Sequence, residues 1–126
     1  MSEIEIKLAA GTDVGLVRKN NEDNFVVNRD LSQSEWIIPQ SSETIPLGKY
    51  GTLLVVADGM GGTNAGEVAS AIAIETVQNA FTPEKLDKIV TFEGEMATEE
   101  AIEEFLTKTI KAADLNIVNA SKEDEV

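Results

Sequence analysis

A chain of 126 residues, of which 42% are hydrophobic, has the size of one globular domain with a modest core. Its 23 acidic and 10 basic residues give a formal charge of -13, which argues against nucleic acid or an anionic membrane surface as the main partner. Because the chain has no cysteine and no histidine, disulfides, thiolate metal sites, cysteine nucleophiles and serine–histidine triads are excluded, and carboxylates must carry any chemistry.

The chain begins with an alternating pattern that predicts a half-buried strand at the edge of a sheet. Ile4, Ile6 and Leu8 fall on one side of this strand, and Glu5 and Lys7 fall on the other. The pattern lacks the basic region and the long apolar core of a signal peptide, and no stretch of the chain reaches membrane-spanning length. We therefore expect a soluble, cytoplasmic protein.

A second strand is predicted at Phe25–Val27, and three charged residues lie before it. These residues are Arg18, Glu22 and Asp23, which fall on the connection that leads into the strand. An arginine presents a planar fork suited to phosphate oxygens, and adjacent carboxylates are the hard oxygen ligands that Mg²⁺ and Mn²⁺ prefer. The spacing of Arg18 and Glu22 is also that of an ordinary surface ion pair, so both interpretations stay open.

Serine, glutamine, glutamate and proline are frequent in residues 29–50, and this composition predicts a loop. A short strand is expected within it at Trp36–Ile38. Trp36 is the single tryptophan of the chain, and we expect its large side chain to cover one end of the core.

The clearest signal in the sequence follows this loop. Leu53–Ala57 is an apolar run without alternation, which predicts a strand buried on both faces. Asp58 ends the run and is followed by Gly59, Gly61 and Gly62, which let the backbone pass close to a ligand. This is a place to hold a cation or a phosphate. The alternative is a tight turn in which Asp58 caps the next segment.

Three helices are predicted in the second half of the chain. Asn64 is the expected N-cap of the first helix, and Thr82 followed by Pro83 predicts a short second helix that runs through Val90. Thr98 is the expected cap of the last helix. The core-facing positions at helical spacing are Val68, Ala69, Ile72, Ala73, Val77, Ala80 and Phe81 in the first helix and Ile102, Phe105, Leu106, Ile110, Ala113 and Ile117 in the last.

The two groups of acidic residues belong together if the strands at 16–28 and 53–57 are neighbours, because each group lies where a strand meets a loop. Three carboxylates that converge without a histidine would repel one another unless a divalent cation neutralised them. Since the chain offers neither nitrogen nor sulfur ligands for zinc, Mg²⁺ or Mn²⁺ fits such a site best.

Four segments together resemble the opening motifs of the metal-dependent protein phosphatase 2C family in its bacterial form. They are Gly11–Gly15, Arg18–Asp23, Val56–Gly62 and Gly66–Ser70, and their order and spacing match as well as their residues. The resemblance implies an α+β fold, in which an antiparallel β-sandwich is flanked by helices in an α-β-β-α arrangement. It also implies hydrolysis of phosphoserine and phosphothreonine by a water that two metal ions activate.

The resemblance also implies roles for single residues. Arg18 would bind the substrate phosphate, Asp58 would bridge two Mn²⁺ or Mg²⁺ ions, and the carbonyl of Gly59 would ligate one of them. Glu22 and Asp23 would hold metal-bound waters. The implied partners are a phosphoprotein substrate and a cognate protein kinase.

The resemblance covers nearly the whole chain but only the first part of the family's domain, so we expect residues 1–126 to form a single incomplete domain. The Gly-Met-Gly-Thr strand and the later aspartates of the family are absent, and Asp87 and Asp114 do not match them. We therefore expect little or no catalysis by this chain, and exposed strand edges that favour a dimer.

Two other functions remain open beside the phosphatase. One is a non-catalytic regulatory or interaction module with the same fold. The other is a glycine-rich anion-binding domain at a helix N-terminus, although the chain has no Walker lysine at the required spacing.

Overall fold

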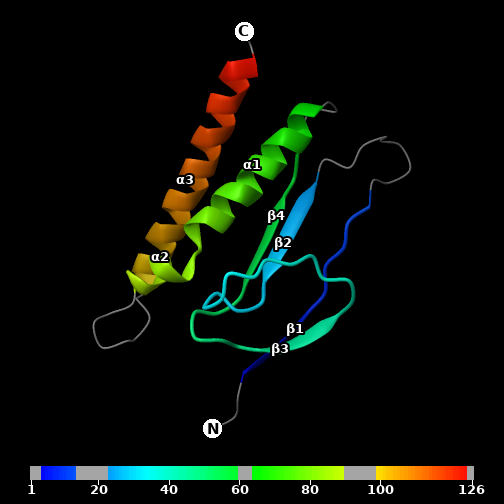
Figure 1. Ribbon diagram of the computed structural model, residues 1–126, viewed down its shortest axis with the longest axis vertical. Helices are drawn as coiled ribbons and strands as arrows, with labels where there is room; N and C mark the ends of the chain where they lie inside the picture. The colour runs from blue at the N-terminus through cyan, green and yellow to red at the C-terminus, as the bar shows by residue number, and fades with distance from the viewer. Residues whose placement is uncertain (1–3, 14–22, 60–63, 90–98, 125–126) are drawn as a thin grey trace.

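The computed structural model describes residues 4–13, 23–59, 64–89 and 99–124. The chain has the predicted α+β class, with small antiparallel sheets and helices (Figure 1). The described elements are β1 (Glu5–Leu8), β2 (Asn24–Asn28), β3 (Glu43–Pro46), β4 (Leu53–Ala57), α1 (Asn64–Ala80), α2 (Pro83–Asp87) and α3 (Glu99–Asp124). Among the described helices, none combines the length and the apolar character that crossing a membrane requires.

The four strands form two separate antiparallel pairs whose members alternate along the chain. β1 pairs with β3, and β2 pairs with β4. In the second pair, Asn24 lies opposite Ala57 at one end and Asn28 lies opposite Leu53 at the other. The predicted first strand is confirmed as an edge strand, with Leu8 buried. The complete β-sandwich that the resemblance implies stays a prediction.

One strand lies inside the segment that we predicted to be a loop. β3 has only four residues, one of them a proline, so its sequence carries little strand signal. It forms because it pairs with β1 and buries Ile45. The short strand expected at Trp36–Ile38 is a single bridge, in which Val27 and Ile37 exchange backbone hydrogen bonds of 2.9 and 2.8 Å.

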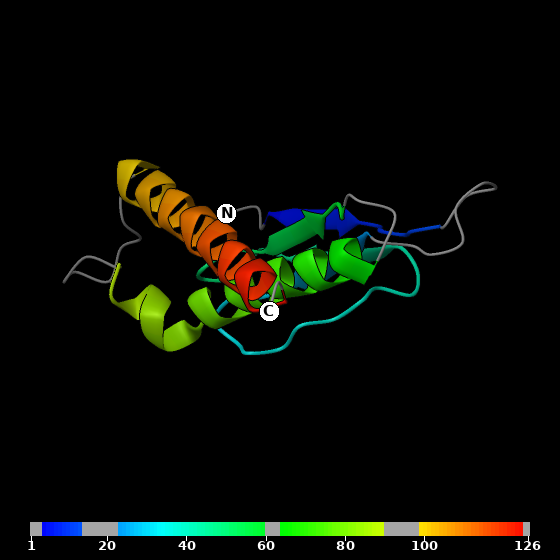
Figure 2. The same ribbon diagram turned by 90° about the horizontal axis from the view of Figure 1, so that it is seen from above.

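β4 is a strand as predicted, but the prediction that both of its faces are buried is wrong. Leu54 is 51% exposed and Val56 is 79% exposed, whereas their neighbours along the strand are half-buried. The difference arises because α1 covers one face of the β2–β4 pair. Figure 2 shows α1 and β1 on opposite sides of β4, and β1 does not cover Leu54 and Val56.

The helix α1 packs against β2, β4 and α3. Its predicted core stripe is right for Phe81, which directly follows the helix and is buried, but wrong for Val68, which is 45% exposed. Ile74 and Ser70 are buried instead, which shifts the contact face of the helix around its axis. In α3 the predicted core positions Leu106 and Ile110 are 37% and 66% exposed, whereas the predicted position Ala113 is buried.

The start of α2 confirms the predicted cap. The backbone N–H of Lys85 donates to the Thr82 hydroxyl at 3.3 Å, and Pro83 occupies the first turn. The described helix ends at Asp87, a little before the predicted end.

Two hydrophobic clusters hold these elements together. One joins the loops beside the sheet to the helices, and its buried members are Leu31, Tyr50, Phe81 and Leu86. Trp36 packs against this cluster, so its predicted role as a cover of the core is confirmed. The other cluster lies between the two sheets and consists of Leu8, Val27 and Ile45.

Candidate functional site

The pairing of β2 with β4 brings two of the predicted site residues to the same end of one sheet. Asp23 immediately precedes Asn24, Asp58 immediately follows Ala57, and Asn24 and Ala57 are paired. The two aspartates therefore occupy opposite positions just beyond the paired residues. Figure 1 shows the start of β2, the end of β4 and the start of α1 at this same end of the molecule.

Both aspartates reach the surface of the described part of the chain. Asp23 and Asp58 are exposed, whereas the neighbouring Gly59 is buried. Carboxylate side chains at opposite positions of paired strands are hard oxygen donors of the kind that a divalent cation binds.

Only part of the predicted site lies within the described residues. Asp23, Asp58 and Gly59 are described, whereas Arg18 and Glu22 lie outside the described residues. Among the residues that the structure describes, no three acidic side chains form a group that could hold a metal ion. The expected convergence of three carboxylates therefore stays a prediction, because its third member would be Glu22.

Asp58 lies at the end of a hollow of about 300 Å³ beside β4. The hollow is bounded by the last residues of β4, by one face of α1 and by α3, and most of its wall is apolar. Its walls include the small side chains of Ala69, Ser70 and Ala73 on α1 and the exposed Ile110 on α3. Small residues on α1 leave this space open, so an apolar segment can lie next to Asp58.

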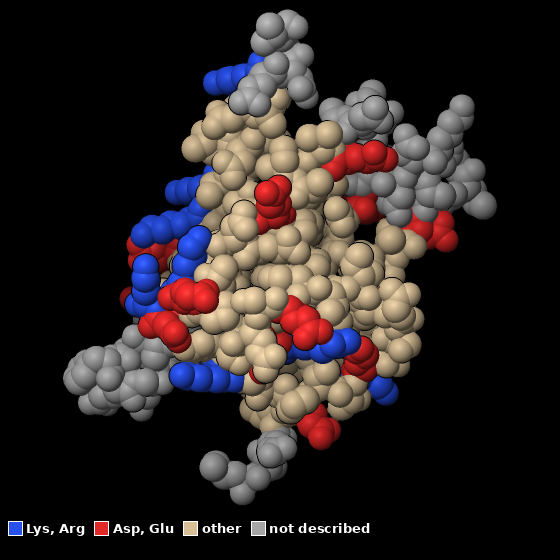
Figure 3. Space-filling model, in the orientation of Figure 1, with Lys and Arg blue, Asp and Glu red and all other residues tan. Residues whose placement is uncertain are grey.

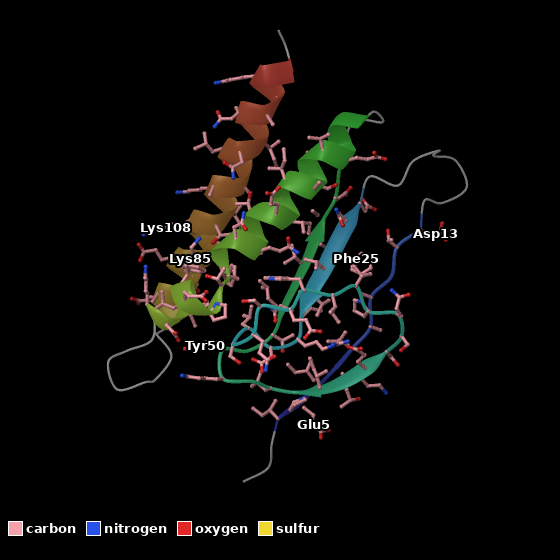
Figure 4. The ribbon with its side chains drawn as sticks, viewed as in Figure 1. Glu5, Asp13, Phe25, Tyr50, Lys85 and Lys108 are labelled. Carbon is pink, nitrogen blue, oxygen red and sulfur yellow. The ribbon has the colours of Figure 1, made fainter. Side chains whose placement is uncertain are left out.

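Asp23 borders a different hollow, of about 360 Å³, on the face of the sheet that lies away from α1. The residues that follow β1 form one wall, and β2 and β4 form the other. Figure 4 shows Phe25, which lines this hollow, between β2 and the chain that follows β1. Asp23 and Asp58 thus each border an apolar hollow, and the two hollows lie on opposite faces of the β2–β4 pair.

The opposite end of the β2–β4 pair is a buried polar corner that the sequence analysis missed. Asn28 is 1% exposed; its Oδ1 accepts the backbone N–H of Asp30 at 3.0 Å, and its Nδ2 donates to the carbonyl of Gln33 at 3.2 Å. The available signal was a short polar side chain at the end of an apolar strand, two residues before an aspartate, which is typical of a side-chain-bonded turn.

An ion pair next to this corner links the two sheets. Arg29 binds both carboxylate oxygens of Glu43 and lies 3.7 Å from Glu35. The hydrogen bond from Arg29 is the main cause that lowers the pKa of Glu43, and the positive charge of Arg29 adds to it against the effect of partial burial. On the face seen in Figure 3, acidic and basic side chains are scattered between stretches of uncharged surface.

Comparison with known proteins identifies bacterial relatives. The chain is 32% identical over 113 residues to the serine/threonine phosphatase stp of Listeria monocytogenes serotype 4b, a match that covers 90% of this chain and 34% of the relative. It is 33% identical over 107 residues to the serine/threonine phosphatase stp of Listeria innocua, covering 85% of this chain and 32% of the relative. The chain thus spans about a third of the length of the relatives it matches. No family model and no solved structure matches it.

Proposed function

This chain is a relative of bacterial serine/threonine phosphatases that spans about a third of their length, and from this relationship we propose that it forms part of a metal-dependent protein serine/threonine phosphatase. The substrate class would be phosphoserine and phosphothreonine in proteins, and the metal would be Mn²⁺ or Mg²⁺. The observation that carries the proposal is the alignment of Asp23 with Asp58 at one end of the β2–β4 pair.

The donor set fits a hard divalent cation in part. Asp23, Asp58 and the carbonyl of Gly59 supply only oxygen, which is the ligand type that Mg²⁺ and Mn²⁺ prefer. These cations favour about six ligands, so the described residues would provide part of one coordination shell and Glu22 would add to it. When bound, such ions lower the pKa of a coordinated water and neutralise charge on the phosphoryl oxygens.

The chain's own residues would then divide the remaining work. Asp58 would anchor the cation at the end of a fixed strand, so that its position is set by the backbone of β4. Arg18 would hold two phosphate oxygens at once through its planar guanidinium group. Because the described residues bring no further aspartate to Asp23 and Asp58, we propose that the chain alone has little or no activity.

We test the proposal by titrating the chain with Mn²⁺ and with Mg²⁺ while recording the amide NMR signals of Asp23, Asp58 and Gly59. We expect Mg²⁺ to shift these signals and Mn²⁺ to broaden them, and we expect both effects to disappear in Asp58→Asn. The control is Asp87→Asn on α2, an exposed acid outside the site, which should respond as the parent does. If Asp58→Asn and Asp87→Asn respond equally to the metals, or if the parent chain shows no response at Asp23, Asp58 and Gly59, the metal site is contradicted.

A second candidate function is a non-catalytic interaction module. The exposed Leu54 and Val56 on β4 favour it, because contiguous apolar side chains on a surface are typical of binding faces. The two functions differ in their dependence on Asp58. A module should keep its partners in a pull-down experiment with Asp58→Asn, whereas recognition of a phosphoprotein at the metal site should be lost.

The proposed partners follow from the proposed function. They are a phosphoprotein substrate, a protein kinase that produces it, and a second copy of the chain bound through an open strand edge. Among the described strands, β4 has β2 as its only neighbour, so its outer edge offers backbone N–H and C=O groups to another strand.

A further inference from the structure

The buried corner at the end of β2 lies at the opposite end of the strand from Asp23. Its central residue, Asn28, is one of the two largest fully buried side chains of the described chain. The amide uses its oxygen to accept from Asp30 and its nitrogen to donate to Gln33. Because the oxygen and the nitrogen of its amide both bind backbone groups, Asn28 fixes the path of the chain immediately after β2.

The fixed path is joined directly to the chain that enters β4. The N–H of Leu31 donates to the carbonyl of Gly51 at 2.9 Å, and the hydroxyl of Thr52 donates to the carbonyl of Arg29 at 2.9 Å. These two contacts continue the pairing of β2 with β4 beyond its last residue pair. The turn that follows β2 and the chain that enters β4 are therefore directly connected.

The alignment of the two strands matters at the other end of the pair. Five residue pairs connect the corner to the aspartates, from Asn28 opposite Leu53 to Asn24 opposite Ala57. A slip of one residue would place Asp58 opposite Asn24 and would turn the side chains of one strand to the other face. The two carboxylates would then no longer lie opposite each other.

We propose that Asn28 is a positioning residue, which sets the β2–β4 register from the corner and thereby brings Asp23 opposite Asp58. The hydrophobic pattern alone specifies this register weakly, because the exposed Leu54 and Val56 on β4 are apolar like the residues on its covered face. The hydrogen bonds of Asn28 at the corner then select this register over the others. The importance of the two aspartates rests on the proposed function, whereas the effect on register does not.

The test compares Asn28→Ala with Thr109→Val. Thr109 is also a buried polar residue, at 6% exposure, but its hydroxyl donates to Phe105 within α3 and takes no part in the sheet. The first measurement is the set of cross-strand nuclear Overhauser contacts between Asn24 and Ala57, and the second is Mn²⁺ affinity from the broadening of the Asp23 and Asp58 amides. We expect Asn28→Ala to lose the contacts and to weaken Mn²⁺ binding about tenfold, as for other residues that orient metal ligands.

The outcomes separate the two proposals. If the parent chain does not respond to Mn²⁺, the proposed function fails, but the cross-strand contacts still test Asn28. Cross-strand contacts that persist in Asn28→Ala, or that Thr109→Val loses equally, overturn the positioning role. If Asn28→Ala does not fold, Thr52→Val decides: it removes one hydrogen bond of the same corner, and contacts between Asn24 and Ala57 as strong as in the parent would overturn the proposal.

Discussion

Arg29 and Glu43 tie the end of β2 to the start of β3 through two parallel hydrogen bonds. Arg29 Nε donates to Glu43 Oε2 at 2.8 Å, and Arg29 Nη2 donates to Glu43 Oε1 at 2.7 Å. Because β2 and β3 belong to different sheets, this forked ion pair connects the two sheets directly.

The ion pair predicts a specific acid sensitivity. Since its hydrogen bond with Arg29 lowers the pKa of Glu43 in the folded chain, the carboxylate stabilises the fold above its unfolded pKa, about 4.3, and loses that effect as the pH falls through the lower folded value. We expect urea denaturation between neutral pH and about pH 3 to show a smaller loss of unfolding free energy in Glu43→Gln than in the parent. Glu84→Gln, at an exposed position on α2, should keep the parent's dependence, and an unchanged Glu43→Gln profile would contradict the prediction.

The contact between Phe81 and Phe105 predicts how much each ring contributes to the free energy of unfolding. The two rings meet edge to face, with centroids 4.9 Å apart and planes at 82°. Phe81 is 7% exposed, so Phe81→Ala should lower the unfolding free energy by about 3–5 kcal/mol. Phe105→Ala removes a less buried ring and should cost less. Equal losses by urea denaturation would show that the ring contact itself, rather than burial, dominates.

Gly48 predicts a steric requirement in the loop before β4. A Cβ atom added there would lie 2.5 Å from Asp30 Oδ1, and that carboxylate is already held by the N–H and hydroxyl of Ser32. Gly48→Ala should therefore lower the unfolding free energy by about 1–3 kcal/mol. Gly11→Ala is the matched control, since a Cβ at Gly11 meets nothing within 4 Å, and its effect should stay within about 0.5 kcal/mol. Similar thermal midpoints for the two variants would contradict the prediction.

A substitution on the exposed face of β4 should change self-association of the chain without changing its free energy of unfolding. Because Val56 is 79% exposed, Val56→Lys should change the unfolding free energy by no more than about 0.5 kcal/mol. It should also reduce the dimer fraction in sedimentation equilibrium, because charge on an open strand disfavours strand pairing. Ile4→Lys, at an exposed position just before β1 of the other sheet, should leave the dimer unchanged. A parent chain that is monomeric at every concentration would contradict the proposed dimer.

Local signals in the sequence predicted the elements whose cause is itself local. The Thr82–Pro83 pair predicted the start of α2, and the apolar run of Leu53–Ala57 predicted β4. The burial of β4 could not be read in the same way, because the exposure of Val56 depends on which elements cover the sheet. β3 was missed for a related reason: pairing with β1, rather than its own propensity, makes Glu43–Pro46 a strand.

The sequence predicted which residues belong to the candidate site better than it predicted how they are arranged. The sequence indicated acids at Asp23 and Asp58 and made their proximity conditional on neighbouring strands, and the β2–β4 pairing meets that condition. The turn at Asn28 had a local signal in the sequence, but its link to the strand register could not be predicted, because only the paired strands define that register. Arg18 and Glu22 remain predictions, since they lie outside the described residues.

The alternation of strand partners along the chain has a consequence for how the protein acquires its fold. β1 can pair only after β3 has been synthesised, and β2 can pair only after β4 has been synthesised. Neither sheet can therefore form as a local hairpin of consecutive strands. Each pairing closes a loop that contains a strand of the other sheet. A single cleavage anywhere between β1 and β4 would therefore separate at least one pair of partners, and the two sheets cannot be divided into independently folding halves.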